Sequence, residues 1–246
     1  MEGSIGLYER TLRIRSQHVT CCRRLRLSSL LTFFQEASIA HTEALGVGRE
    51  KTLDRGLLWI ITKQHIDIRR MPEYDEEITI RSWPGETMHV LFPRFYEVSC
   101  RGDVIITGSA LWMLIDAESR GFVFPDEYGI EIRKMDAGRT LPLPDAIRDR
   151  LPEAGDPRIR TVPRTASFSL LDINGHINNC DYFDLTDDLI PLSVHAAAHP
   201  GTVDAEYLSE IRPGEKFEIA WIEEDGSWLF EGRGDRPKFR IKFTGM

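Results

Sequence analysis

Apolar residues recur along the chain with two periods, and the change of period marks the predicted elements. Residues 10–15 alternate apolar and polar side chains, as a half-buried strand does. From Leu27 the apolar and small positions recur at steps of three and four instead, which predicts a helix with Ser28 or Ser29 near its start and Gly46 near its end. Further strands are predicted at 57–69, 77–83, 88–100, 104–116 and 120–124. This order is typical of an α+β unit, in which the helix covers one face of an antiparallel sheet.

The same order of predicted elements, a strand, a helix and then further strands, begins again after an irregular segment. Between about 134 and 162, prolines stand among charged residues and no period persists, which predicts a linker with a short helix at 145–151. A strand from 163 to 171 and a helix-like segment from about 177 to 189 follow, and then strands at 203–211, 215–223, 227–232 and 237–244. A similarity between 66–80 and 207–219 supports duplication. We therefore predict an N-terminal module at 1–133, a linker at 134–162 and a C-terminal module at 163–246.

Charge and hydropathy narrow the function classes. The 246 residues carry 31 basic and 39 acidic side chains, a formal net charge of −8. Nucleic-acid binding needs a basic face for the phosphates, so we expect no nucleic-acid partner. The longest apolar stretch, 104–115, is interrupted by polar residues and is shorter than the roughly 20 residues that cross a bilayer, so we expect no membrane partner.

Cysteine and histidine spacing argues against disulfides and metals. Cys21 and Cys22 are adjacent and there is no C-x-x-C, which favours a reducing compartment. The first ten residues do not resemble a secretory signal, so the predicted location is cytoplasmic. His195 and His199 have the spacing of a zinc-binding helix, but no glutamate lies between them and Pro200 follows, so we predict no metal.

Candidate chemistry concentrates between Leu171 and Phe183. Asp172, Asn174 and His176 share one side of an extended chain, or surround one point if the chain turns at Gly175. Such groups before a helix can stabilise the oxyanion formed from a carbonyl, because the helix start offers N–H groups and a positive dipole end. The simpler interpretation is a decorated helix cap, since Asp and Asn are favoured there and Asn-Gly is a common turn. Residue types alone leave both interpretations open.

A family resemblance favours the catalytic interpretation. The run Asp-x-Asn-x-His-x-Asn-Asn at 172–179 resembles the signature of the acyl-acyl-carrier-protein (acyl-ACP) thioesterases, and other segments from 56 to 116 and from 206 to 210 are similar to that family in the same order. The resemblance implies two tandem hot-dog modules, each a long helix packed on a curved antiparallel sheet. It implies hydrolysis of fatty acyl-ACP to free fatty acid in fatty-acid biosynthesis, without a cofactor, with the phosphopantetheine-bearing carrier protein as partner.

The resemblance also assigns residues. The catalytic positions of the family fall on Asp172, Asn174, His176 and Glu210. A cysteine follows the acid in many plant members, but Ile211 stands here, which excludes a Cys–His–Asn mechanism at that position. Chain-length selection is expected in the first module, and we place the acyl chain near Trp59, Ile61 and Trp112.

The residues leave several alternatives for the mechanism. Glu210 or Asp172 deprotonates the attacking water, with backbone N–H groups of 176–178 facing the oxyanion, or a carboxylate attacks directly and gives an anhydride. Cys180 as nucleophile is a further alternative, although a cysteine in a first helical turn more often packs in the core.

The partner is also open. Six arginines (10, 13, 15, 23, 24 and 26) make the first 30 residues basic, and we expect them to dock an acidic carrier protein. The alternatives are an acyl-CoA thioesterase and a non-catalytic acyl-binding protein. Many hot-dog domains work in pairs, so a homodimer is the alternative to a tandem chain that satisfies this need alone.

Overall fold

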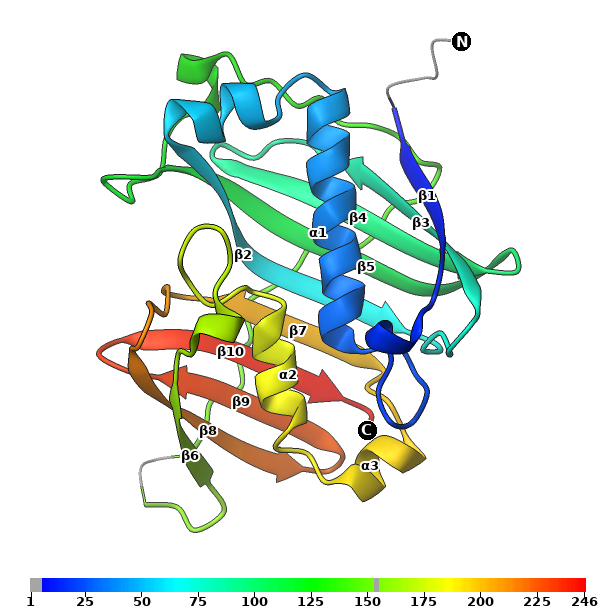
Figure 1. Ribbon diagram of the computed structural model, residues 1–246, viewed down its shortest axis with the longest axis vertical. Coiled ribbons are helices and arrows are strands. Elements are labelled where there is room, and N and C mark those ends of the chain that lie inside the picture. The colour runs from blue at the N-terminus through cyan, green and yellow to red at the C-terminus, as the bar shows by residue number, and fades with distance from the viewer. Residues whose placement is uncertain (1–5, 153–154) are drawn as a thin grey trace.

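All ten strands of the computed structural model, which describes residues 6–152 and 155–246, join in one antiparallel sheet (Figure 1). Their order across the sheet is β1-β3-β4-β5-β2-β7-β10-β9-β8-β6. The strands of the N-terminal half are β1 (Tyr8–Arg13), β2 (Leu57–Ile68), β3 (Glu77–Pro84), β4 (Leu91–Cys100) and β5 (Asp103–Asp116). Those of the C-terminal half are β6 (Arg160–Thr165), β7 (Thr202–Tyr207), β8 (Lys216–Glu224), β9 (Ser227–Arg233) and β10 (Pro237–Thr244). The predicted α+β class with antiparallel sheet is confirmed.

The two halves meet where β2 pairs with β7. Lys63 lies opposite Glu206 and Asp67 lies opposite Thr202, so five consecutive residue pairs join the halves into one sheet. On the far side of β2, β5 pairs along the strand from Leu57 to Ile68. The strand β2 is therefore central, and because β5 and β7 both run antiparallel to it, both strands end toward the start of β2.

The long helix α1 (Leu27–Ala44) covers the sheet of the N-terminal half (Figure 1). Its apolar positions at steps of three and four, among them Leu27, Leu30 and Phe34, are buried as the pattern predicts. Ser28 does not cap it, because the helix begins after Arg26 and the Ser28 hydroxyl instead donates to Asp184 Oδ1 at 2.7 Å. This contact links α1 to the C-terminal half.

The helix of the C-terminal half is much shorter than the predicted segment. It comprises α2 (Asp181–Asp187), and a second short helix, α3 (Leu192–Ala197), follows. Residues before Asp181 are used in a bridge and a turn, and Asp188 forms the C-cap directly after Asp187. Pro191 then prevents continuation.

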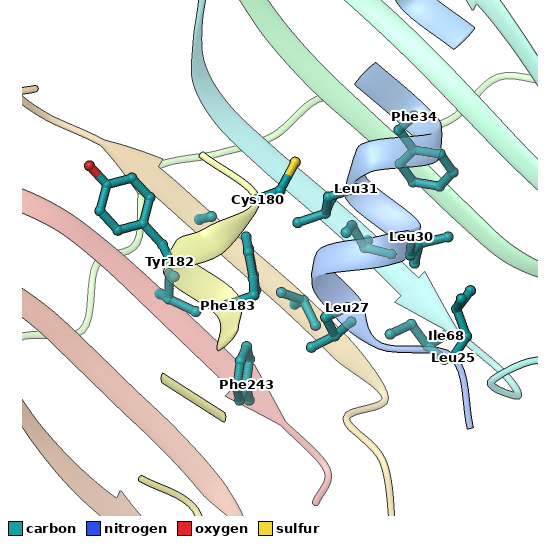
Figure 2. Close-up of a cluster of buried hydrophobic side chains, with 14 of the residues drawn as sticks. Leu25, Leu27, Leu30, Leu31, Phe34, Ile68, Cys180, Tyr182, Phe183 and Phe243 are labelled. Atoms are coloured by element: carbon teal, nitrogen blue, oxygen red, sulfur yellow. The ribbon is translucent and has the colours of Figure 1, made fainter. Parts of the chain in front are cut away.

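The main core runs through both halves. Figure 2 shows Leu27 and Leu31 of α1 on the side that faces Phe183 and Cys180, and Phe243 of β10 lies below them. All five side chains are buried in one cluster. Full burial of each leucine or phenylalanine contributes about 1.5–3 kcal/mol, so the two helices stabilise each other's position over the sheet.

Some predicted elements are different in the structure. Residues 145–151 form no helix; Ile147 packs on Ile222 and Leu229 instead. The predicted strand at 120–124 is reduced to one bridge between Ile115 and Phe122. Single-turn 3-10 helices stand at Ser16–His18, Arg49–Lys51, Leu53–Arg55, Pro125–Tyr128 and Phe168–Leu170. No helix in the described part of the chain is long and apolar enough to cross a membrane.

Candidate active site

A closed loop between Leu171 and Ile177 carries three of the four predicted catalytic residues. Leu171 and Ile177 pair as an isolated antiparallel bridge, and the Asp172 N–H donates to the His176 carbonyl oxygen at 2.8 Å. The chain turns at Gly175, whose φ of +76° is a conformation that glycine adopts without strain. The polar residues therefore surround one point rather than line an extended strand.

Asp172 orders this loop with both of its carboxylate oxygens. Oδ1 accepts the Asn174 N–H at 2.8 Å and the His176 N–H at 3.4 Å, and Oδ2 accepts Asn174 Nδ2 at 3.3 Å. This is the local bonding by which aspartate stabilises a turn. Asp172 therefore holds Asn174 and His176 in place.

Glu210 approaches the loop from beyond the end of β7. The predicted strand over 203–211 ends at Tyr207, so Glu210 lies in the connection that follows it. The next residue, Ile211, is fully buried, and its carbonyl oxygen accepts the Ile177 N–H at 3.1 Å. These contacts hold Glu210 beside the loop, and its Oε2 lies 3.1 Å from His176 Nε2.

Arg120 completes this cluster from the N-terminal half. Its Nη1 lies 2.9 Å from Glu210 Oε1, and its Nη2 lies 3.2 Å from His176 Nε2. The His176 side chain is 12% exposed, while those of Glu210 and Arg120 are 30% and 33% exposed. A cation, a carboxylate and an imidazole thus meet at a partly buried surface formed by both halves.

The position of the proton on His176 determines which contacts are hydrogen bonds. A bare Nε2 accepts from Arg120, whereas a protonated Nε2 donates to Glu210, and one nitrogen cannot do both at once. When Nε2 gains a proton, the hydrogen-bond partner of the imidazole therefore changes from Arg120 to Glu210. The cluster has the arrangement required to take up a proton and return it.

Arg120 was not among the residues predicted from the sequence. It follows β5 in a tight turn in which the Asp116 N–H donates to the Gly121 carbonyl at 2.9 Å, and it has a φ of +59°. The sequence shows only a polar turn here. The arginine meets Glu210 because β2 pairs with β5 on one side and with β7 on the other.

The predicted oxyanion donors at 176–178 are wrong, because each of these N–H groups already has a partner. The N–H of His176 donates to Asp172 Oδ1, that of Ile177 to the Ile211 carbonyl, and that of Asn178 to the Leu170 carbonyl. The side chains of Asn174 and Arg120 are N–H donors at this cluster.

Cys180 is a packed thiol. It is 2% exposed, its Sγ–H donates to Gln35 Oε1 at 3.8 Å, and burial raises its pKa to about 12. Because the thiolate is the nucleophile, a thiol that stays protonated at neutral pH disfavours the cysteine alternative. Burial, with the charges of Asp184 and Asp172, also raises the pKa of the adjacent Asp181 to about 6.

A cavity of about 50 Å³ lies between α1 and the sheet of the N-terminal half. Trp59 and Trp112 line it, together with Ser38, Ile39, Thr42, Pro84, Phe92, Pro93, Arg94 and Ile132. Ile61, the third residue predicted to bind substrate, pairs with Trp112 across β2 and β5 and is buried in the main core. Their role in substrate binding stays a prediction.

Three of the arginines predicted to dock a carrier have internal partners, and one of them, Arg26, donates from Nε to the Val19 carbonyl oxygen at 3.0 Å. Arg24 donates to the carbonyls of His195, Ala196 and Ala198 and so holds the end of α3. Arg13 pairs with Asp75 and Glu77. Since these three guanidinium groups already have partners within the chain, they contribute less to a docking surface than free arginines would.

The predicted zinc-like histidines also bond within the chain. His195 Nε2 lies 3.0 Å from the Asp187 carbonyl and His199 Nδ1 lies 2.9 Å from the Pro200 carbonyl. Within residues 6–152 and 155–246, no group of three or more His, Cys, Asp or Glu side chains is placed to hold a metal ion.

Comparison with known proteins agrees along nearly the whole chain. The family model for the acyl-ACP thioesterase N-terminal domain matches residues 6–132, and that for the C-terminal domain matches 163–237. A chloroplastic acyl-ACP hydrolase of Cuphea viscosissima is 26% identical over 217 residues, covering 83% of this chain and 52% of that protein. A dodecanoyl-ACP hydrolase of Umbellularia californica is 26% identical over 220 residues, covering 85% and 57%. The chain thus spans about half the length of the curated relatives it matches.

Solved structures show the same architecture. An acyl-ACP thioesterase from Bacteroides thetaiotaomicron superposes with a TM-score of 0.83 at 20% identity, covering 97% of both chains. A 12:0-ACP thioesterase from Umbellularia californica gives 0.79 at 20% identity, covering 98% of this chain and 97% of that one. These likenesses confirm the predicted fold class, although the second helix is short here.

Proposed function

The chain belongs to the acyl-ACP thioesterase family, and from this premise we propose that it hydrolyses fatty acyl-ACP to free fatty acid and carrier protein in fatty-acid biosynthesis. The observation that carries the proposal is the contact of His176 with Glu210 at 3.1 Å, at two positions that the family motif marks. Both side chains are partly buried yet reachable, as a reacting pair must be.

Glu210 and His176 together act as the base in this proposal. A water bound beside the Glu210–His176 pair loses a proton to it, and the water oxygen attacks the thioester carbonyl carbon. The tetrahedral intermediate then breaks its C–S bond, and the proton passes to the departing phosphopantetheine sulfur. Arg120 and Asn174 offer N–H donors to the oxyanion, because the backbone N–H groups nearby are occupied.

Asp172 has a positioning role in this reading. Its two oxygens accept three hydrogen bonds from the loop, so Glu210 is the carboxylate available to reacting groups. The alternative of direct carboxylate attack then also concerns Glu210. Single-turnover hydrolysis in ¹⁸O-water separates the two, since an anhydride intermediate opened at the enzyme carbonyl leaves ¹⁸O in Glu210 and water attack does not.

The substrate spans both halves. The acyl chain enters the N-terminal module (1–133) toward Trp59, Ile61 and Trp112, the 134–162 segment links the modules, and the thioester lies at the C-terminal module (163–246). Phe168, which is 92% exposed, lies just before the loop that carries His176, and Ile173, which is 91% exposed, lies within it. Exposed apolar side chains at a site entrance favour contact with a protein partner, here the carrier.

Location and assembly follow from weaker observations. We place the protein in the cytoplasm, because the four cysteines are all free within the described chain. One chain is enough to form the candidate active site, because its N-terminal and C-terminal halves both contribute side chains to it. Cell fractionation and sedimentation of the purified protein test these two statements, and a homodimer is the alternative.

The decisive experiment is an assay of purified protein against a panel of acyl-ACP and acyl-CoA thioesters. We expect release of free fatty acid with a higher kcat/KM for acyl-ACP, and loss of release in Glu210→Gln and His176→Ala. Higher kcat/KM for acyl-CoA supports the alternative substrate. Binding of acyl-ACP without turnover contradicts the enzyme proposal and supports an acyl-binding protein.

A further inference from the structure

Arg94 is a buried cation without a carboxylate partner. It lies on β4, is 4% exposed, and donates from Nη1 to His41 Nδ1 at 3.1 Å and to Ser82 Oγ at 3.2 Å. No Asp or Glu of the described chain lies within ion-pair distance of it. Burial lowers the pKa of Arg94, and a buried charge without a counter-charge is costly.

Arg94 lines the cavity between α1 and the sheet, and a donor without an acceptor lies at the same cavity. Trp59 also lines this cavity, and its buried Nε1 has no hydrogen-bond partner among the residues that the structure describes. Both hydrogen bonds of Arg94 come from Nη1, so its Nε and Nη2 edge has no acceptor among the described residues. Trp112 differs, because its Nε1 donates to Tyr96 Oη at 3.4 Å. The cavity thus offers donors that lack acceptors.

The cavity has room for a small polar group. Its volume of about 50 Å³ corresponds to roughly four water-sized positions. The three heavy atoms of a carboxylate fit this space. The methyl end of a saturated chain also fits, but it leaves the buried N–H groups unsatisfied, which is unfavourable for each group.

We propose that this cavity selects acyl chains with a carboxylate at the far end, so that the preferred thioester is an ω-carboxyacyl carrier protein. The inference rests on the proposed function and names its substrate class. The free Nε and Nη2 edge of Arg94 matches the two oxygens of a carboxylate in a bidentate pair, and Trp59 supplies a third N–H. Hydrolysis then releases a dicarboxylic acid and the carrier thiol.

Kinetics on length-matched substrates test the selection. Wild-type protein is expected to show a kcat/KM at least about 10-fold higher for ω-carboxyacyl-ACP than for the unsubstituted acyl-ACP of equal length. This factor is the free energy that a hydrogen bond to a charged group contributes, expressed as a ratio of rates. Arg94→Met should lose roughly 10- to 100-fold on the carboxylated substrate and little on the unsubstituted one. Trp59→Phe, which keeps the ring and removes the N–H, should lose less.

A matched control distinguishes the cavity from general charge effects. Arg81→Met removes an arginine from the adjacent strand β3, where Arg81 is 47% exposed and pairs with Glu9 at 2.7 Å. This variant should keep the wild-type ratio between the two substrates. A similar change of ratio in Arg81→Met and Arg94→Met contradicts the proposal.

Binding of free acids tests the cavity independently of turnover. By calorimetry, a dicarboxylic acid should bind wild-type protein more tightly than the monocarboxylic acid of equal length, and Arg94→Met should abolish the difference. Tighter binding of the dicarboxylic acid without hydrolysis of any thioester contradicts the proposed function, but it leaves the carboxylate-binding role of the cavity intact. Hydrolysis with no preference for the carboxylated chain, or a stronger preference for an ω-hydroxyacyl chain, overturns the assignment while the thioesterase activity stands. If Arg94→Met does not fold, the wild-type comparison still decides.

Discussion

Replacement of Arg120 by methionine removes one charge from the candidate active site and keeps most of the aliphatic bulk. The guanidinium touches Glu210 Oε1 at 2.9 Å and His176 Nε2 at 3.2 Å. With charge centres about 4 Å apart, the attraction to Glu210 is roughly 4 kcal/mol at an effective dielectric constant of 20. Both side chains are about one-third exposed, so solvent reduces this to about 1–3 kcal/mol.

The expected effect of Arg120→Met is a fall in kcat of roughly 5- to 150-fold, with little change in KM. Arg120 orients Glu210 and His176 rather than the acyl chain, so its loss affects the reacting state more than binding. Arg120→Lys keeps the charge but not the two-pronged contact, and should recover part of the rate. Added guanidinium at low concentration should rescue Arg120→Met and not wild type.

Steady-state kinetics on acyl-ACP measures these effects, and a double-mutant cycle locates them. Glu210→Gln combined with Arg120→Met should cost less than the sum of the single changes, because each removes the same contact. Arg139→Met is the matched control, since Arg139 pairs with Glu97 at 3.2 Å outside the cluster, and it should keep wild-type kcat. Wild-type kcat in Arg120→Met, or additive losses in the cycle, refutes a role for Arg120 in positioning the pair.

Three further predictions concern single side chains. Glu210→Gln should lower kcat by about 10²–10⁴-fold, which is the usual loss for a positioned base. Cys180→Ala should keep most activity, because the buried thiol of Cys180 stays protonated, and the opposite pattern in the same assay supports a cysteine nucleophile. Burial raises the pKa of Asp187 to about 8, so the stability that this group contributes is complete below about pH 4 and is lost as the pH rises through 8. The variant Asp187→Asn should therefore raise the Tm at pH 9 and not at pH 4, and a gain in Tm that does not depend on pH contradicts this. Phe168→Ser with Ile173→Ser should raise KM for acyl-ACP more than for acyl-CoA, and equal effects on both substrates argue against carrier contact at these residues.

Local pattern was sufficient for most of the architecture. The period of α1 and the alternation of the strands follow from which side chains must face the core, and that requirement is written residue by residue in the chain. The loop that carries Asp172, Asn174 and His176 was also predictable, because the hydrogen bonds that close it join residues within eight positions of each other. Local bonds of this kind depend on neighbours in the sequence and on little else.

Contacts between distant segments were decided only when the halves came together. Arg120 meets Glu210 across 90 positions, through the pairing of β2 with both β5 and β7. Of the N–H groups at 176–178, that of Ile177 was taken up by a distant segment, through the Ile211 carbonyl, whereas those of His176 and Asn178 have local acceptors. Tertiary packing also buried Arg94 beside the cavity without a carboxylate. Sequence periodicity reports which face of an element is apolar, but not which polar groups of two elements will meet, because that depends on register and on competition for the same hydrogen bonds.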